Sequence, residues 1–244
     1  MLKVGLVFLL FFFSLTHVMA QQLRDLVFMT EEYPPYNYTE HNQLKGISID
    51  VLDQALKNFG LQPVKVRSYP WVRGYEAVLR GPNVVLFSMT RTVAREDLFQ
   101  WVGPISPTEI VLIAKKGRVK FDEENLLRNY SVGVVRSDIG ELLVSQKFGS
   151  VNLQFSSQPD QVARQLISGR IDVWAYEKNV ALWIIKQMGG DPNDYEILHV
   201  LERSELYFAL SKDVDTRLVR QLQNAVDHIT EIGLTEKIIK KNLK

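Results

Sequence analysis

The strongest constraint on the fold is an alternation of short apolar runs with amphipathic stretches, which occurs twice along the chain. The apolar runs predict three strands in each copy, at residues 26–30, 63–68, 83–89, 131–135, 151–155 and 171–175. The amphipathic stretches predict helices, and two of them have clear apolar faces: Leu52, Ala55, Leu56 and Phe59 in the first copy, and Leu218, Leu222, Ala225 and Ile229 near the C-terminus. The alternation is typical of α/β proteins with mostly parallel sheets flanked by helices. Two copies therefore predict two similar lobes with a ligand cleft between them.

Two connectors are expected to join these lobes. A Pro-bearing segment at residues 104–109 precedes the second copy, and a polar segment at residues 202–206 follows it. Apolar runs at 110–114 and 206–210 predict a further strand after each connector. We expect residues 21–107 and 206–244 to form lobe I, and residues 108–205 to form lobe II. A chain that crosses twice between two lobes can act as a hinge.

The first twenty residues predict a secretory signal peptide. Lys3 is followed by an apolar run over residues 4–15, and Val18 and Ala20 occupy the two positions that a signal peptidase reads. The alternative is an uncleaved anchor, but the run is shorter than the roughly 20 residues of a spanning helix. After cleavage the chain would have no Cys for lipid attachment and no net charge. We expect a soluble periplasmic or secreted protein that is not a lipoprotein.

The composition of the 244 residues argues against several classes of protein. The chain has no Cys, and 29 Lys and Arg balance 28 Asp and Glu, which disfavours disulfide scaffolds, Cys-based zinc modules and nucleic-acid binding. The four His residues are far apart in sequence and no metal-binding spacing occurs. Gly-rich phosphate loops and Gly-x-Ser-x-Gly elbows are also absent. No cofactor, metal site or catalytic residue is predicted.

Two loops remain as candidates for ligand binding. An aromatic loop at residues 33–38 follows the first predicted strand, and a loop rich in hydroxyls and Arg at residues 88–96 follows the third. Both lie at carboxyl ends of strands, where α/β sheets bind ligands. Arg can hold a carboxylate by paired hydrogen bonds. The alternatives are that the rings only cover the sheet and that the Arg side chains are solvated.

The order and spacing of several segments resemble the extracellular solute-binding proteins of family 3, which serve polar amino-acid ABC importers. These segments are residues 33–36, 45–51, 71, 88–95, 132–135 and 169–172, with a C-terminal helix ending at Gly233. The resemblance covers essentially the whole chain after residue 20. It implies a two-lobed periplasmic-binding-protein fold of type II, the Venus flytrap.

The resemblance also implies roles for residues of lobe I. Arg95 would hold the α-carboxylate of a ligand, and Ser88 and Thr90 would give further hydrogen bonds. Tyr33 and Trp71 would pack against the ligand side chain.

In lobe II the resemblance implies three further site residues, with departures from the family pattern. Glu177 stands where the family usually has an Asp that binds the α-ammonium; the alternative is a surface carboxylate at a helix start. Asp138 and Ile139 stand in a loop where the family usually has Gly-Thr-Thr or Gly-Ser-Thr. The acid at 138 would repel a carboxylate, or act as its own helix cap. The ligand's identity therefore stays open.

The function that these expectations favour is binding of a small polar solute, foremost an amino acid or related carboxylate. The closed form would be delivered to the membrane permease of an ABC importer, and the protein is expected to be a monomer. One alternative is an enzyme similar to cyclohexadienyl dehydratase, with Glu177 as a general acid. The other is a soluble sensory subunit that presents its closed form to a membrane receptor or kinase.

Overall fold

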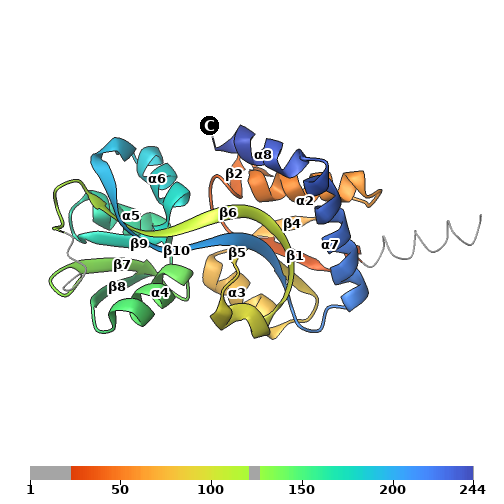
Figure 1. The fold of residues 1–244 in the computed structure, drawn as a ribbon, viewed down its shortest axis with the longest axis horizontal. Coiled ribbons are helices and arrows are strands. Elements are labelled where there is room, and N and C mark those ends of the chain that lie inside the picture. Colours follow the sequence, from red (N-terminus) through yellow and green to blue (C-terminus); the bar gives the residue numbers. More distant parts are fainter. Residues whose placement is uncertain (1–22, 121–126, 244) are drawn as a thin grey trace, which may run out of the picture.

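The computed structural model describes residues 23–120 and 127–243, so the predicted signal peptide lies outside the described residues. One eight-stranded sheet runs through the molecule in the order β4-β1-β5-β10-β6-β9-β7-β8. Figure 1 shows a group of elements at each end, joined across the middle by the long strands β6 and β10. We call the group with β1, β4 and β5 the first half, and the group with β7, β8 and β9 the second half.

The first half is built on three short parallel strands. Its strands and the helices between them are β1 (Val27–Thr30), α2 (Ile47–Asn58), β4 (Val66–Ser68), α3 (Trp71–Arg80) and β5 (Val84–Thr90). Strand β1 lies between β4 and β5 and is parallel to both. All seven residues of β5 are buried, which agrees with the apolar run over residues 84–87.

The second half repeats this arrangement. Its elements are β7 (Ser131–Val135), α4 (Ile139–Phe148), β8 (Asn152–Ser156), α5 (Pro159–Ile167), β9 (Val173–Glu177) and α6 (Lys178–Gln187). Strand β7 lies between β8 and β9 and is parallel to both. Both predicted β-α-β-α-β units are therefore present, with boundaries shifted by a few residues.

The segments expected as connectors lie inside two long antiparallel strands. Strands β6 (Gln100–Lys115) and β10 (Tyr195–Leu210) have 16 residues each and pair along their length, whereas the sequence predicted strands only at 110–114 and 206–210. The other parts of these two strands contain polar residues, and the sequence therefore indicated loops there. The ladder shifts register three times, and such irregularities let strands with prolines and polar residues continue.

The remaining elements are short or terminal. They are the hairpin β2 (Tyr38–Glu40) and β3 (Gln43–Lys45), the 3-10 turns η1 (Val93–Leu98) and η2 (Pro192–Asp194), and the helices α7 (Thr216–Glu231) and α8 (Leu234–Asn242). The sequence reading had no hairpin in this loop. Glu32 fixes it, because its carboxylate accepts hydrogen bonds from the backbone N–H and the hydroxyl of Thr39 at 2.8 and 2.7 Å.

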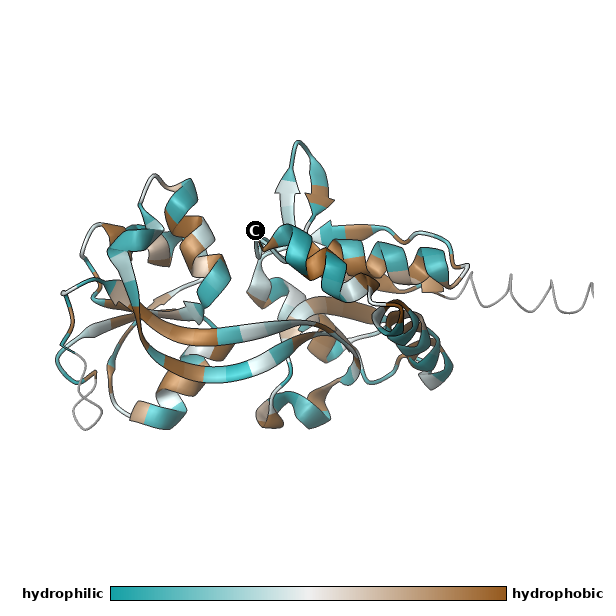
Figure 2. Ribbon diagram, turned by 45° about the horizontal axis from the view of Figure 1, so that its top comes forward, coloured by the Kyte–Doolittle hydropathy of each residue, from teal (hydrophilic) through white to brown (hydrophobic). Residues whose placement is uncertain are grey.

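The core follows the amphipathic pattern of the helices. In Figure 2 much of the long strands is hydrophobic, whereas the helices carry hydrophilic stripes. The predicted apolar face of α7 is buried, and it consists of Leu218, Leu222, Ala225 and Ile229. Within the described ranges, no helix has both the length and the apolar character needed to cross a membrane.

Helix α4 approaches β9 so closely that only glycine fits at position 140. A Cβ atom there would lie 2.4 Å from the backbone oxygen of Ala175. We expect Gly140→Ala to lower the free energy of unfolding by about 2 kcal/mol, because overpacking forces the backbone to shift. Ser145→Ala, on the exposed face of the same helix, is the control. Urea unfolding checks this, and equal midpoints for the two variants would contradict the expectation.

Candidate functional site

Buried polar side chains gather where the two halves meet. In the first half they lie at or just after the ends of β1 and β5. In the second half they lie at or just after the ends of β7 and β9, so all are at carboxyl ends of parallel strands. The cluster consists of Glu31, Thr90, Arg95, Asp138 and Glu177, none of which is more than 8% exposed. Burying so many charged groups is costly unless they are paired or serve a ligand.

Arg95 connects the halves. Its guanidinium lies over the rings of Trp71 and Tyr75, at 5.5 and 5.3 Å from their centres. It donates hydrogen bonds to the backbone oxygens of Thr90 at 3.4 Å and of Ser137, in the second half, at 3.2 Å. The indole N–H of Trp71 donates to the same Ser137 oxygen at 3.1 Å. Residues predicted for the ligand carboxylate and side chain therefore contact the opposite half directly.

Asp138 differs from the expectation that it would cap its own helix. It occupies the N-cap position of α4, but its side chain accepts no cap hydrogen bond. In the first turn of the same helix, the Glu141 carboxylate accepts a hydrogen bond from the Ser137 N–H at 2.7 Å. Its Oδ2 atom is buried and has no hydrogen-bond partner among the described residues. Burial raises the pKa of Asp138, whereas the positive charge of Arg95 and the nearby backbone N–H groups of Ile139 and Gly140 oppose this shift.

Glu177 stands at a helix start, as its alternative reading supposed, yet it is fully buried. Its Oε1 accepts a hydrogen bond from the Tyr36 hydroxyl at 2.9 Å, and its Oε2 accepts one from the Val180 N–H at 2.8 Å. Burial raises the pKa of Glu177 to about 7, and these two hydrogen bonds act in the opposite direction. At neutral pH its carboxyl group is therefore poised between its two protonation states.

The other predicted site residues have distinct surroundings. The ring of Tyr33 stacks on the ring of Tyr36 and meets the ring of Tyr176 edge-on, with distances between ring centres of 5.6 and 5.8 Å. The Ser88 hydroxyl bonds with the hydroxyl of Ser48 at 2.7 Å and donates to Asn37, so it is engaged within the first half. Ile139 is buried and lines a separate cavity beside η1 and α4.

Glu31 is the residue that sequence reasoning missed. It is 7% exposed and directly follows β1. Burial raises the pKa of its carboxyl well above the usual range, with further contributions from Asp138 and Glu32, while Arg95 opposes the shift. Its position at the carboxyl end of the first strand was the available signal, since the neighbouring Tyr33 was selected on that ground.

The cluster is acidic overall. It contains three buried acids, Glu31, Asp138 and Glu177, and one buried cation, Arg95, whose charge acts on Glu31 and Asp138. Three or more His, Asp or Glu side chains close enough to hold a metal ion do not occur in the described parts of the chain. This arrangement suits a small organic molecule that carries both a carboxylate and positive charge.

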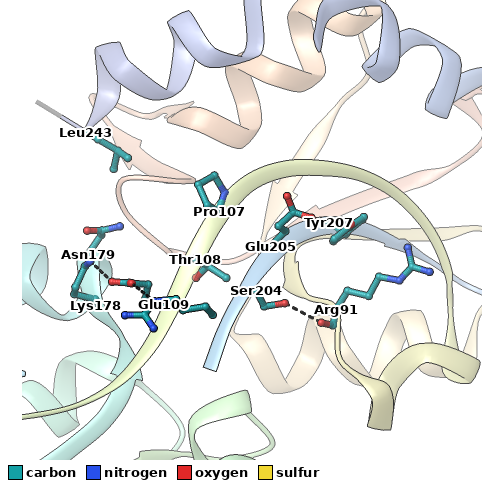
Figure 3. A pocket seen from close by; sticks show the side chains of 11 residues that line it. Arg91, Pro107, Thr108, Glu109, Lys178, Asn179, Ser204, Glu205, Tyr207 and Leu243 are labelled. Atoms are coloured by element: carbon teal, nitrogen blue, oxygen red, sulfur yellow. Dashed lines mark hydrogen bonds and ion pairs between the residues drawn. The ribbon is translucent and has the colours of Figure 1, made fainter. Parts of the chain in front are cut away.

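Two cavities border the cluster. The larger, of about 670 Å³, lies beside β6 and β10 and includes Thr108 and Asn179, which contact Glu177. Figure 3 shows Glu109 beside Lys178, with which it forms an ion pair. Glu109 also pairs with Arg203 at 2.9 Å. The smaller cavity, of about 360 Å³, includes Glu31 and Trp71 and lies between the halves.

Comparisons with known proteins agree with this architecture. The chain is similar to the arginine-, lysine-, histidine-binding protein ArtJ from the thermophilic bacterium Geobacillus stearothermophilus (18% identity, TM-score 0.77, 89% of this chain and 94% of that chain). It is also similar to a histidine kinase sensor domain with similarity to periplasmic binding proteins (19% identity, TM-score 0.77, 89% of this chain and 95% of that chain). A third similar structure is an ancestral amino acid-binding protein, a precursor of cyclohexadienyl dehydratase (20% identity, TM-score 0.76, 95% of this chain and 99% of that chain). A sequence search of curated proteins finds no match.

These structures confirm the predicted fold, a mixed α/β periplasmic-binding-protein fold of type II. The sequence profile of the bacterial extracellular solute-binding proteins, family 3, matches residues 26–244. This range contains both halves and the buried cluster between them. The chain therefore belongs to the bacterial extracellular solute-binding proteins of family 3.

Proposed function

We propose that this protein binds an α-amino acid, or a closely related small polar solute, between its two halves. The observation that carries the proposal is Arg95, a buried guanidinium that reaches from the first half to the Ser137 loop of the second. Its two hydrogen bonds within the described chain use two of five N–H donors, which leaves donors for a carboxylate. The amino-acid-binding proteins with this fold support the same class of ligand.

The ligand would bridge the two halves. Its carboxylate would bind Arg95, with Thr90 beside it, and its ammonium would bind Glu177. Tyr33 and Trp71 would pack against its side chain. A ligand that contacts both halves favours the closed form over the open one, because only differential affinity shifts such an equilibrium.

We propose that closure takes place about the two crossing strands. The hinge would lie at residues 104–109 of β6 and 202–206 of β10, with residues 21–107 and 206–244 moving as lobe I and residues 108–205 as lobe II. The register shifts that the ladder contains near these segments support this position, since irregular pairing bends more easily than a regular ladder.

The proposed setting is the periplasm, after removal of residues 1–20. The closed, loaded form would be recognised by the membrane permease of an ABC importer, as membership of an extracellular solute-binding family supports.

A thermal-shift screen tests the proposed function. Residues 21–244 would be unfolded and refolded to remove carried-over ligand, then heated with each of the twenty amino acids, small dicarboxylates, polyamines, short peptides and prephenate. At one hundred times its dissociation constant, a ligand stabilises by about 2.7 kcal/mol, or roughly 5–11 °C for a chain of this size. A shift with an amino acid supports the proposal, and no shift with any of them contradicts it.

A specific observation also favours a second candidate, an enzyme of the dehydratase type. Glu177 is buried, has a pKa of about 7 and accepts a hydrogen bond from Tyr36, which suits a general acid. The sequence reading found no partner base. Turnover of prephenate or arogenate that disappears in Glu177→Gln would establish this candidate, and binding without turnover would exclude it for those substrates.

A further inference from the structure

The cavity of about 360 Å³ is formed by both halves of the molecule. The first half contributes residues around Glu31, Tyr69 and Trp71, and the second half contributes the start of α5, with Asp160, and Trp183 of α6. A molecule in this cavity would therefore touch both sides of the proposed hinge. None of these residues apart from Trp71 was selected from the sequence.

The charged side chains of this cavity all have the same sign. Glu31, Glu32 and Asp160 line it, and no Lys, Arg or His is found among the described residues of its wall. Two arginines touch rings of the wall without lining it: Arg73 lies over Tyr69 at 4.5 Å, and Arg95 lies over Trp71 at 5.5 Å. The open space itself is thus bordered by carboxyl groups and by aromatic rings.

Glu31 is the decisive member of this wall. The carboxylate of Glu32 is engaged by Thr39 and Ser68, and Asp160 is exposed to water. Glu31 is buried, and no group in residues 23–120 or 127–243 donates a hydrogen bond to its carboxyl. A buried carboxyl without a partner is costly, so a site that keeps one is suited to a group that arrives with positive charge.

The aromatic rings indicate an organic cation instead of a metal ion. The cavity is lined by the rings of Tyr38, Tyr69, Trp71 and Trp183. The ring centres of Tyr38 and Trp183 are 5.9 Å apart. Cations of the ammonium and guanidinium type bind over such rings. A metal ion would need several oxygen ligands converging on one point, and the described residues offer no such group of three.

Trp71 connects this cavity to Arg95. We propose, on the basis of the function proposed above, that the cavity binds the positively charged end of the ligand's side chain next to Glu31. The ligand is then an amino acid with an ammonium or guanidinium side chain. Its carboxylate lies at Arg95, and its side chain passes Trp71 into the cavity.

Titration calorimetry of the refolded protein tests this with matched ligands. L-Arginine and L-lysine carry the charge, L-citrulline and L-glutamine are neutral counterparts, and agmatine is arginine without its carboxylate. We expect L-arginine or L-lysine to bind at least about tenfold more tightly than its neutral counterpart, since charge-assisted hydrogen bonds are the stronger ones. Glu31→Gln should remove about tenfold of affinity for the cationic ligand and leave L-glutamine within about threefold. Glu231→Gln, an exposed change at the end of α7, is the control.

The outcomes separate this inference from the proposed function. If a neutral or acidic amino acid binds at least as tightly as L-arginine and L-lysine, the cation site is wrong while the proposed function stands. If agmatine binds as tightly as L-arginine, the cation site stands and the role of Arg95 is wrong. Binding of none of the amino acids overturns both. The preference of the unaltered protein decides the matter even where a variant folds poorly.

Discussion

We expect replacement of Arg95 by Ala to weaken binding of a carboxylate ligand by roughly 150-fold, the equivalent of about 3 kcal/mol. The loss is large because Arg95 is 4% exposed, so the ligand's carboxylate would stay buried without its partner. Titration calorimetry with the amino acid found by thermal shift measures the effect.

Arg91→Ala is the matched control for this change. Arg91 lies in the same loop, but it is partly exposed and pairs with Glu96 instead of facing the cluster. We expect its affinity to stay within about threefold of the unaltered protein, as for a surface ion pair. Equal affinities for Arg95→Ala and Arg91→Ala would show that Arg95 does not hold the ligand.

Removing the buried charge of Glu177 changes how stability depends on pH. Since burial raises the pKa of Glu177 from 4.5 to about 7, the folded protein keeps a proton that the unfolded chain loses. The free energy of unfolding therefore falls as pH rises from about 4.5 through 7, by on the order of 3 kcal/mol from this group. Gln cannot ionise, so the Glu177→Gln variant does not lose this free energy of unfolding as pH rises. Its free energy of unfolding relative to that of the unaltered protein therefore increases by about the same amount between pH 4 and pH 8.

Urea unfolding across this pH range measures the difference. Glu31 and Asp138 also have raised pKa values, but both are present in both proteins and cancel in the comparison. Glu231→Gln, which changes an exposed carboxylate, should run parallel to the unaltered protein. If the Glu177→Gln curve also runs parallel to it, Glu177 has the same pKa in the folded protein as in the unfolded chain, and its proposed poise near neutral pH is wrong.

The secondary structure could be predicted where local pattern and burial coincide. The apolar positions Leu52, Ala55 and Leu56 lie within α2 and are buried, as their spacing predicted. Phe59, the fourth position of that pattern, is instead the C-cap residue and is 40% exposed. The helix begins at Ile47. The backbone N–H groups of Ile47 and Ser48 donate to the oxygens of Pro35 and Tyr36, which satisfies the helix start by a tertiary contact. No local pattern indicates such a contact.

The long crossing strands could be predicted only in part for a similar reason. Their apolar ends were visible as runs at 110–114 and 206–210, but their polar middles were not. Those middles are strands because each pairs with the other, for example Pro107 with Glu205 and Thr108 with Ser204. Pairing between residues nearly one hundred positions apart is set by the whole fold, and propensity does not report it.

The candidate site shows the same division. The resemblance to a known family pointed to Arg95, Asp138 and Glu177, and the structure buries all three where the halves meet. Glu31 was missed because a Glu after a strand is usually solvated. Its surroundings also include Asp138 of the second half, more than one hundred residues away, whose charge acts on the Glu31 carboxyl.

The central claim is that a ligand is held between two halves that close upon it. Small-angle X-ray scattering of the refolded protein, with and without a saturating amount of the amino acid that gives the largest thermal shift, tests it most directly. The account predicts that the radius of gyration falls on binding, and that it does not fall for Arg95→Ala at the same concentration. A ligand that stabilises the protein against heat but leaves its radius of gyration unchanged would contradict closure about β6 and β10.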